Sequence, residues 1–476
     1  MPIPALLWFR QDLRLADHAA VAALEGRPVL PVHVLEDGPD APGGAAAWWL
    51  HHSLSALGRA LAERGAPLLL LRGDPRRLIP ELAERIGAAE VHAGRQTEPA
   101  ARRRDAETHA ALEAAGRRLV LHRTALLHEP HLVRTGAGKP FSVYTPFSRA
   151  VFTLLEGLPP PLPAPDRLQA APGAPEGLPL EALGLLPKPP EPDWAAEFHA
   201  HWTPGENGAA ARLATFLEHG LDGYAARRNE PAAAWGTSGL SPHLHLGEIS
   251  PRQVWHAARA KGGRGRESFL KELVWREFSH HLLWHRPEMP DTPLRPEFAA
   301  FPWQRDAALL RAWQRGRTGY PIVDAGMRQL WRTGWMHNRV RMIAASFLVK
   351  HLLQPWQDGA AWFRDTLVDA DLAANSASWQ WVAGCGADAA PYFRVFNPVL
   401  QGETFDPAGT YVRRWCPELA RLPDRFIHRP HEAPDTVLHG AGVKLGRDYP
   451  APLIGLAEGR ARALAAFATV KGTEAA

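Results

Sequence analysis

Residues 267–285, which we expect to form a helix, present four side chains that could act together on a planar ligand. Glu272, Trp275, Arg276 and Ser279 recur at spacings of three and four residues, so a helix would place them on one face. An indole can stack on a nucleic-acid base, a carboxylate can accept its N–H groups, and a guanidinium can hold a phosphate. The alternative is an ordinary amphipathic helix with a Glu272–Arg276 ion pair.

A second helix is expected over residues 335–353. Its apolar stripe consists of Met336, Val340, Ile343 and Phe347. Its opposite face holds Asn338, Arg341, Met342 and Ala345, with Arg339 beside it. A helix face covered with charge is usually solvated, whereas amide and thioether groups between arginines favour a semi-apolar pocket.

A loop of small residues, Gly236–Pro242, precedes a further helical segment. Its hydroxyl and backbone N–H groups could hold a phosphate. The alternative is a plain helix cap, with Ser241 before Pro242.

The carboxylates of Asp369 and Asp371 could in principle bind a divalent cation, but the segment lacks the regular series of oxygen ligands of a calcium loop. The histidine pairs of the chain also lack the spacing of metal ligands, and we interpret them as structural. We therefore expect no metal site.

Composition narrows the class of protein. The 476 residues are 46% hydrophobic and 22% charged, which excludes global disorder. Two cysteines exclude a disulfide framework and a four-cysteine iron–sulfur cluster. The N-terminus lacks the layout of a signal peptide, and no apolar run is long enough to span a membrane. We expect a cytoplasmic protein. The net charge is −2 over residues 1–204 and +6 over residues 205–476, so a polyanionic partner would favour the C-terminal part.

The first 130 residues alternate short apolar runs with helical segments. Strands are expected at residues 5–9, 28–35, 67–71, 90–92 and 118–122. Helices are expected at residues 46–64, 76–86 and 100–115. This alternation predicts an α/β domain at residues 1–130, with a parallel sheet and helices on both faces.

The rest of the chain divides at a segment rich in proline and glycine. We expect an interdomain connector at residues 131–205, because the composition of residues 155–205 cannot hold a helix or a central strand for long. Residues 206–476 have mostly helical patterns, which predicts a larger all-α domain.

Several long motifs in order identify a resemblance. LLWFRQDLRLADHAAVAAL, VYTPFSRA, GTSGLSPHLHLGEISPRQVW and ELVWREFSHHLLWH resemble successive blocks of the photolyase/cryptochrome flavoprotein family. So do TGYPIVDAGMRQLWRTGWMHNRVRMIAASFLVKHLL and DADLAANSASWQWVAGCGADAAPYFRVFNPVLQGETFD. With GGAAAWWLHHSL, the sequence is most similar to bacterial cyclobutane pyrimidine dimer photolyases of the group near plant cryptochromes.

The resemblance implies FAD bound within the helical domain. Residues expected near its phosphates are Tyr224, Thr237, Ser238, Leu240 and Ser241. Residues expected around the ribityl, flavin or adenine are Glu272, Arg276, Arg341, Asp369, Asp371 and Asn375. Arg341 would pair with Asp369, and Asn375 would lie near flavin N5, where a neutral side chain permits the reduced anionic flavin. Many relatives have arginine where this chain has Gly239.

The resemblance also implies UV-damaged DNA as the partner and a flipped-out pyrimidine dimer as the substrate. Trp275 and Trp381 would stack against the dimer, and Glu272 would hydrogen-bond its base edge. Further contacts to dimer or phosphate would come from Arg228, Asn338, Arg339, Met342 and Gln401.

The implied reaction is light-driven: excited reduced FAD donates one electron to the dimer, the ring splits and the electron returns. Trp379, Trp356 and Trp303 match the family's chain that reduces oxidised flavin from the surface. Asn338 and Met342 stand where (6-4) photolyases have histidines, so that activity is not expected. The alternative function is a blue-light receptor, a cryptochrome, which the full pocket set and short C-terminal region disfavour.

An antenna chromophore is expected with the N-terminal domain, in segments containing Trp8, Arg10 and Glu98. Relatives that bind a deazaflavin have Asp where this chain has Gln96, so methenyltetrahydrofolate is favoured and deazaflavin is the alternative. We expect the protein to be a monomer.

Overall fold

The computed structural model describes residues 3–38, 41–187, 193–388 and 393–472. It divides into two compact units. Unit 1 comprises Met1–Asp222, Ser238–Pro287 and Val368–Ala373, and unit 2 comprises Gly223–Thr237, Glu288–Leu367 and Ala374–Ala476. Each unit is described by itself.

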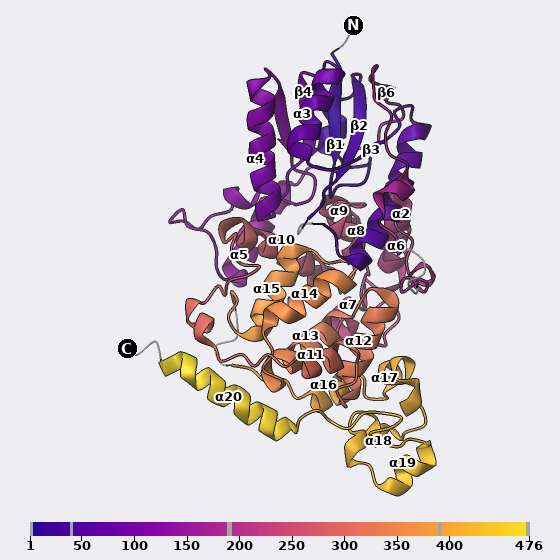
Figure 1. The fold of residues 1–476 in the computed structure, drawn as a ribbon, viewed down its shortest axis with the longest axis vertical. Helices are drawn as coiled ribbons and strands as arrows, with labels where there is room; N and C mark the ends of the chain where they lie inside the picture. The colour runs from indigo at the N-terminus through magenta and orange to yellow at the C-terminus, as the bar shows by residue number, and fades with distance from the viewer. Residues whose placement is uncertain (1–2, 39–40, 188–192, 389–392, 473–476) are drawn as a thin grey trace. The chain divides into compact units, whose positions relative to one another are not determined.

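Unit 1 contains a parallel sheet at its N-terminal end (Figure 1). The strands are β1 (Ala5–Phe9), β2 (Pro28–Leu35), β3 (Leu69–Arg72), β4 (Glu90–Gly94) and β5 (Arg118–His122), in the order β3-β2-β1-β4-β5. A short strand, β6 (Gln169–Ala170), pairs with the start of β2. The residues of β1 and β2 are buried throughout, which explains their continuous apolar runs, because a parallel sheet is covered on both faces.

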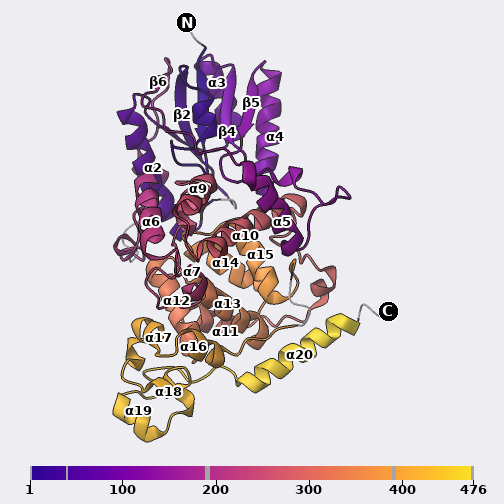
Figure 2. The ribbon, with the colours of Figure 1, turned by 180° about the vertical axis from the view of Figure 1, so that it is seen from behind.

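The helices that follow these strands have clear start signals. They are α1 (Ala19–Ala22), α2 (Gly44–Glu63), α3 (Pro75–Arg85) and α4 (Pro99–Ala114). Asp74 caps α3 by accepting a hydrogen bond from the Arg76 backbone N–H, and proline occupies the first turn of both α3 and α4. Helices α2 and α4 lie at opposite ends of the row of strands in both views (Figure 1, Figure 2).

The strand order matters for function. From β1 the chain adds β2 and β3 on one side and β4 and β5 on the other, so the connections diverge between β1 and β4. A crevice outside the carboxyl ends of the strands at such a point is the usual ligand position in an open parallel sheet.

Unit 1 also contains helices from later in the chain. They are α5 (Tyr144–Leu154), α6 (Glu206–His219), α8 (Ser241–His245), α9 (Pro251–Lys261) and α10 (Arg266–His285). Between α5 and α6, the described residues have only short 3₁₀ turns and β6 as regular structure, as proline-rich composition dictates.

Unit 2 is helical. Its helices are α7 (Tyr224–Arg227), α11 (Ala307–Gln314), α12 (Pro321–Thr333), α13 (Asn338–Ser346), α14 (Trp356–Thr366), α15 (Leu372–Ala383, whose first two residues fall in unit 1), α16 (Pro398–Phe405), α17 (Thr410–Trp415), α18 (Asp424–Ile427), α19 (Asp435–Ala441) and α20 (Leu456–Gly472). The short helices α17, α18 and α19 form a group at one end of this unit (Figure 2). The predicted fold class, an α/β domain plus an all-α region, is confirmed.

The helix predicted over residues 335–353 begins later than expected. Gly334, in left-handed conformation, ends α12, and His337 caps α13 by accepting a hydrogen bond from the Arg339 backbone N–H. The last turn, Phe347–His351, is a π-helix. The predicted stripe of Met336, Val340, Ile343 and Phe347 is fully buried.

The predicted domain boundaries at residues 130 and 205 remain a proposal. The two compact units cut the chain differently, because residues 131–222 and helices α8, α9 and α10 belong to unit 1 with the sheet.

Candidate functional site

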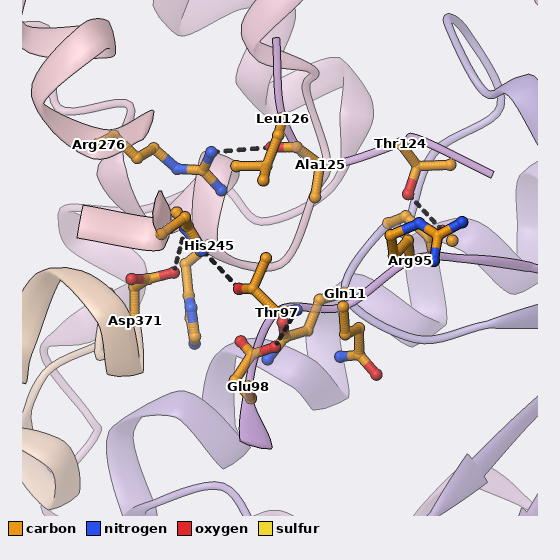
Figure 3. Close-up of a pocket in the computed structure, with 14 residues that line it drawn as sticks. Gln11, Arg95, Thr97, Glu98, Thr124, Ala125, Leu126, His245, Arg276 and Asp371 are labelled. Carbon is orange, nitrogen blue, oxygen red and sulfur yellow. Dashed lines mark hydrogen bonds and ion pairs between the residues drawn. The ribbon is translucent and has the colours of Figure 1, made fainter. Parts of the chain in front are cut away.

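Unit 1 has a pocket at the point where its strand order reverses (Figure 3). The pocket lies between residues at or after the ends of β1, β4 and β5, residues of α8 and α10, and Asp371. The predicted flavin-site residues Arg276 and Asp371 therefore share one pocket, together with Glu98.

A hydrogen-bonded chain crosses this pocket. Thr97 Oγ1 lies 2.7 Å from His280 Nδ1, and His280 Nε2 lies 3.2 Å from Asp371 Oδ2. Burial would raise the pKa of the Asp371 carboxyl, but His280, Arg276 and His245 outweigh it and hold this pKa well below its usual range. Asp371 is thus an anion at neutral pH, although it is almost fully buried.

Arg276 also lines this pocket and is held by two backbone carbonyl groups. Its Nη1 donates to Ala125 O at 2.8 Å (Figure 3). Its Nη2 donates to Leu244 O at 3.4 Å. Beside it, burial lowers the pKa of His245 against the opposing effect of Asp371 and Asp369, which favours a neutral imidazole there. The pocket therefore offers a carboxylate, a guanidinium and imidazoles to a polar heterocycle.

The exposed face of α10 contains a fixed indole. Trp275 is half-buried, and Tyr144 of α5 stacks on it with ring centroids 3.5 Å apart and planes inclined by 4°. The Tyr144 hydroxyl donates to Lys271 O at 2.9 Å, one helical turn before Trp275. Glu272 is half-buried on the same helix, so the predicted indole, carboxylate and guanidinium of α10 all reach the surface or the pocket.

The alternative interpretation of the loop before α8 is a helix cap in which Ser241 is the N-cap residue. Ser241 is the first residue of the helix, and no side-chain hydrogen bond caps it, so the interpretation of Ser241 as an N-cap is wrong. The neighbouring Ser238 is half-buried, and Leu240 is buried. Gly239 has a left-handed φ of 64°, and the Arg212 side chain of α6 lies against it.

Unit 2 gathers arginines around the start of α13. The pKa of His337 falls to about 3 because of burial and then of Arg341, Arg339 and Arg228. Arg339 Nη2 donates to Asn229 Oδ1 at 2.9 Å, and Arg341 Nε donates to Met336 O at 2.7 Å.

The predicted lesion contacts of α13 lie on its accessible face. Asn338 is exposed at the first position of the helix, and Met342 is half-buried one turn later. This face combines the guanidinium groups of Arg339 and Arg341 with the thioether of Met342, whereas Ala345 is buried, and the predicted semi-apolar pocket stays a prediction.

The remaining predicted residues of unit 2 occupy several elements. Tyr224 is buried in α7, with Arg228 over its ring at 5.4 Å, and Thr237 is half-buried. On α15, Asn375 Nδ2 donates to Ala360 O at 3.0 Å, and half-buried Trp381 donates to Asp388 O at 3.2 Å. Gln401 is half-buried in α16.

The three predicted electron-transfer tryptophans differ in exposure. Trp379 and Trp356 are 2% and 1% exposed, whereas Trp303 is half-buried and contacts Phe301 at 4.3 Å. Phe363 packs edge-on against Trp379 at 5.0 Å. A relay from solvent to the interior needs such a gradient of exposure.

The antenna site stays a prediction, because the unit 1 pocket that Glu98 lines is also lined by Arg276 and Asp371, which are predicted for the flavin. Glu98 lines the unit 1 pocket together with Gln96. Trp8 is instead buried in the sheet layer with Arg10 and Arg104 over its ring, and Arg10 is bound by Asp105 and Gly94 O. Trp8 and Arg10 do not line this pocket, because Trp8 lies within β1 and both side chains are buried in the core.

Within the described residues, no group of three or more His, Cys, Asp or Glu side chains is placed to hold a metal ion. His280 instead contacts Thr97 and Asp371, and His243 pairs with Glu248. No helix in the described ranges is long and apolar enough to cross a membrane.

Known proteins similar to this chain cover nearly all of it. The FAD binding domain of DNA photolyase matches residues 269–469, and the DNA photolyase domain matches residues 5–166. A deoxyribodipyrimidine photo-lyase of Agrobacterium fabrum is 50% identical over 99% of this chain and 98% of that protein. The chain belongs to the DNA photolyase family.

Two further comparisons refine its place in that family. The crystal structure of a bacterial class III photolyase from Agrobacterium tumefaciens superposes with a TM-score of 0.95 and 48% identity, over 99% of this chain and 98% of that one. Cryptochrome-1 of Arabidopsis thaliana is 37% identical over 99% of this chain but only 71% of its own length. Named photolyases are thus the more similar relatives, and the predicted resemblance is confirmed.

The predicted photolyase residues divide between the two units. Unit 1 holds Ser238, Leu240, Ser241, Glu272, Trp275, Arg276, Asp369 and Asp371. Unit 2 holds Tyr224, Arg228, Thr237, Asn338, Arg339, Arg341, Met342, Asn375, Trp381 and Gln401. The predicted pair of Arg341 with Asp369 joins residues of different units and stays a prediction.

Sequence reasoning did not assign three residues of the candidate site. Arg212 lies against Gly239, Tyr144 stacks on Trp275, and His280 contacts Thr97 and Asp371. Tyr144 stands in the quoted block VYTPFSRA, and His280 was interpreted as structural. Nothing in the local pattern of α6 distinguishes Arg212 from a solvated helix residue.

Proposed function

We propose that this protein repairs cyclobutane pyrimidine dimers in DNA, using light absorbed by a bound FAD. The main support is the α10 face, where an indole is fixed on an aromatic platform beside a carboxylate and a guanidinium. The near full-length similarity to named deoxyribodipyrimidine photo-lyases supplies the reaction.

The residues present fit FAD. Ser238 and the small-residue loop before α8 suit a diphosphate, whereas Arg276 and anionic Asp371 suit a hydrogen-bonding ring system. When bound and reduced, FAD would supply the light-driven electron that splits the cyclobutane ring and would take it back afterwards.

Residues of each unit would have a role in binding the dimer. Trp275 would stack on the dimer, and Glu272 would accept hydrogen bonds from its base edge. Asn338 and Met342 would contact the bases, and Trp381 would form a second stacking surface. Arg228, Arg339 and Gln401 would hold the flanking phosphates, which makes binding sensitive to salt. A dimer pairs weakly, and this lowers the cost of flipping it out of the duplex.

The tryptophans of unit 2 would keep the cofactor reduced. Trp303, at the surface, would pass an electron through Trp356 to Trp379. Asn375 offers a neutral amide to the flavin, held in place by Ala360 O.

Repair itself is the decisive test. The holoprotein is reduced, mixed with an oligonucleotide containing one thymine dimer, and illuminated with blue light. We expect the absorbance of the thymine band to return in the light and not in the dark. Trp275→Ala and Glu272→Ala should lose most of this recovery, whereas Trp255→Phe, at a buried tryptophan of α9, should repair normally. A photoreducible flavin without repair would indicate the cryptochrome function instead.

Three finer points belong to the same proposal. We propose an antenna chromophore near Glu98, with methenyltetrahydrofolate favoured over deazaflavin. An absorbance band of folate beside that of flavin in freshly purified protein would support it, and a flavin-only spectrum would contradict it.

We also propose a monomer in the cytoplasm, where two buried free thiols would stay reduced.

A further inference from the structure

The Arg212 side chain occupies the space beside Gly239. Its Nε donates to Ser238 O at 2.8 Å. A Cβ atom added to Gly239 would lie 2.3 Å from Arg212 Nη2 and 2.8 Å from Cζ. The guanidinium therefore lies directly against the backbone of the Gly236–Pro242 loop.

Two features of Gly239 make this approach feasible. Its φ of 64° is a conformation that L-residues adopt only with strain, and the missing side chain leaves the room that the guanidinium fills. With any larger residue at position 239, either Arg212 or the loop would have to move.

Arg212 is also well placed to hold a charge. It is half-buried, and burial lowers its pKa, but an arginine stays protonated at any physiological pH. Burial removes part of the hydration that stabilises this charge. An anion bound at the loop would replace that stabilisation. A planar guanidinium pairs with two phosphate oxygens at once, which suits a diphosphate better than a single ammonium does.

We propose that Arg212 is a phosphate-binding residue of the FAD site, acting from α6 together with the Ser238–Gly239 backbone. The inference rests on the proposed function in taking FAD as the ligand. It assigns a ligand contact to a helix that carries no flavin-site motif, and it explains why this loop can have glycine at position 239.

The opposing explanation is that Arg212 only fixes the loop through Ser238 O. The two roles respond differently to substitution. Arg212→Gln can still donate a hydrogen bond to the loop but loses the charge, whereas Arg212→Lys keeps the charge and loses the planar donor geometry. A phosphate contact predicts that lysine preserves more FAD affinity than glutamine. A loop contact predicts no advantage for lysine, because both side chains can donate to Ser238 O.

The experiment measures the dissociation constant of FAD for the full-length holoprotein, from the fluorescence of flavin released on dilution. A charge-assisted contact of this kind is worth about ten- to a hundredfold in affinity, so Arg212→Gln should weaken FAD binding by that factor and Arg212→Lys by less. Arg64→Gln is the matched control, because Arg64 is a half-buried arginine whose Nε donates to another loop carbonyl, Pro165 O, at 2.9 Å. It should leave FAD affinity unchanged.

A double variant that moves the guanidinium from position 212 to position 239 tests the same contact. In the Arg212→Gln background, Gly239→Arg would extend a new guanidinium into the vacated space, and part of the lost FAD affinity should return. In the wild-type background, Gly239→Arg should give no gain, because the space is occupied. The melting temperature of each variant after flavin removal reports any purely structural effect.

Three results would overturn the inference: FAD affinity of Arg212→Gln equal to wild type, no greater FAD affinity in Arg212→Lys than in Arg212→Gln, or a loss of melting temperature in the flavin-free variant large enough to explain the weaker binding. Failure of the proposed function is a separate result, since the wild-type protein would then contain no FAD or would not repair the dimer.

Discussion

At the scale of single residues, the α10 indole shows how a site residue depends on a neighbour that sequence reasoning did not assign. Tyr144 covers one face of Trp275 at 3.5 Å, and its hydroxyl ties it to Lys271 O on the same helix. The ring contact and the hydrogen bond together restrict both the position and the tilt of the indole. Such a restriction matters for a stacking residue, because a freely rotating indole would lose entropy when the base binds.

We therefore expect Tyr144→Leu to weaken binding of a dimer-containing oligonucleotide by about two- to tenfold, the value of one aromatic pair, and Tyr144→Phe to bind nearly as wild type. Affinity for undamaged DNA should not change, since phosphate contacts do not involve Trp275. Fluorescence anisotropy with both oligonucleotides measures this.

The control is Phe152→Leu, on the same helix, where the ring packs against Trp255 at 5.5 Å instead of Trp275. If Phe152→Leu weakens dimer binding as much as Tyr144→Leu, the effect belongs to the general packing of α5.

At the scale of elements, close packing of helices holds the innermost tryptophan of the predicted relay. In unit 2, a Cβ atom added to Gly359 of α14 would lie 2.2 Å from the Trp379 ring and 2.7 Å from Leu348 Cδ2. The glycine lets α14 approach α15 and the π-helical turn 347–351 closely enough to clamp the ring. A single methyl group at this position would force the tryptophan out of its place.

Gly359→Ala should accordingly lower the free energy of unfolding by about 1–3 kcal/mol, the usual cost of overpacking a core. It should also slow photoreduction of the flavin, because Trp379 would be displaced. Gly58→Ala in α2 is the matched control of opposite sign: its added Cβ meets nothing within 4 Å. That change should raise stability by about 1 kcal/mol through helix propensity. Urea unfolding compares both variants, and equal stabilisation by the two would refute the packing argument.

At the scale of the whole molecule, buried histidines govern the response to acid. Burial lowers the pKa of His33, His281 and His351 to about 4. The folded state holds these rings neutral, while the unfolded chain protonates them near pH 6.5, so the unfolded state binds more protons as the pH falls. The stability they contribute is present above pH 6.5 and is lost as the pH falls towards 4. Burial raises the pKa of Asp324 and Asp406, and these two carboxyl groups act in the opposite direction.

The free energy of unfolding should therefore fall between pH 7 and pH 5, before the carboxylates with lowered pKa titrate. One histidine shifted to about 4 contributes about 2 kcal/mol of this loss at pH 5. His33→Asn tests it, because asparagine can still donate to Phe9 O, which lies 3.1 Å from His33 Nδ1. The difference in stability between the two pH values should shrink by about that amount in the variant. An unchanged difference would show that His33 titrates normally.

The sequence by itself determined the elements of this protein and the faces of its site helices. The apolar runs at β1 and β2 match the observed strands residue for residue, because a strand buried on both faces must be largely apolar. The strand predicted at residues 118–122 also matches β5, although β5 is only half-buried. The helical spacing of Glu272, Trp275 and Arg276 predicted that they share one face, and several long motifs in the same order as in the family predicted the family. Boundaries that depend on caps, such as His337 before α13, were less well predicted.

Only the tertiary structure decided which partners complete the site. Tyr144 meets Trp275, Thr97 joins His280 and Asp371, and Arg212 lies on Gly239, although these residues are far apart along the chain. Residue spacing specifies which side chains share a face of one element, since that depends on local backbone geometry alone. Which face meets which neighbour depends on the packing of whole elements, and that is a property of the folded chain.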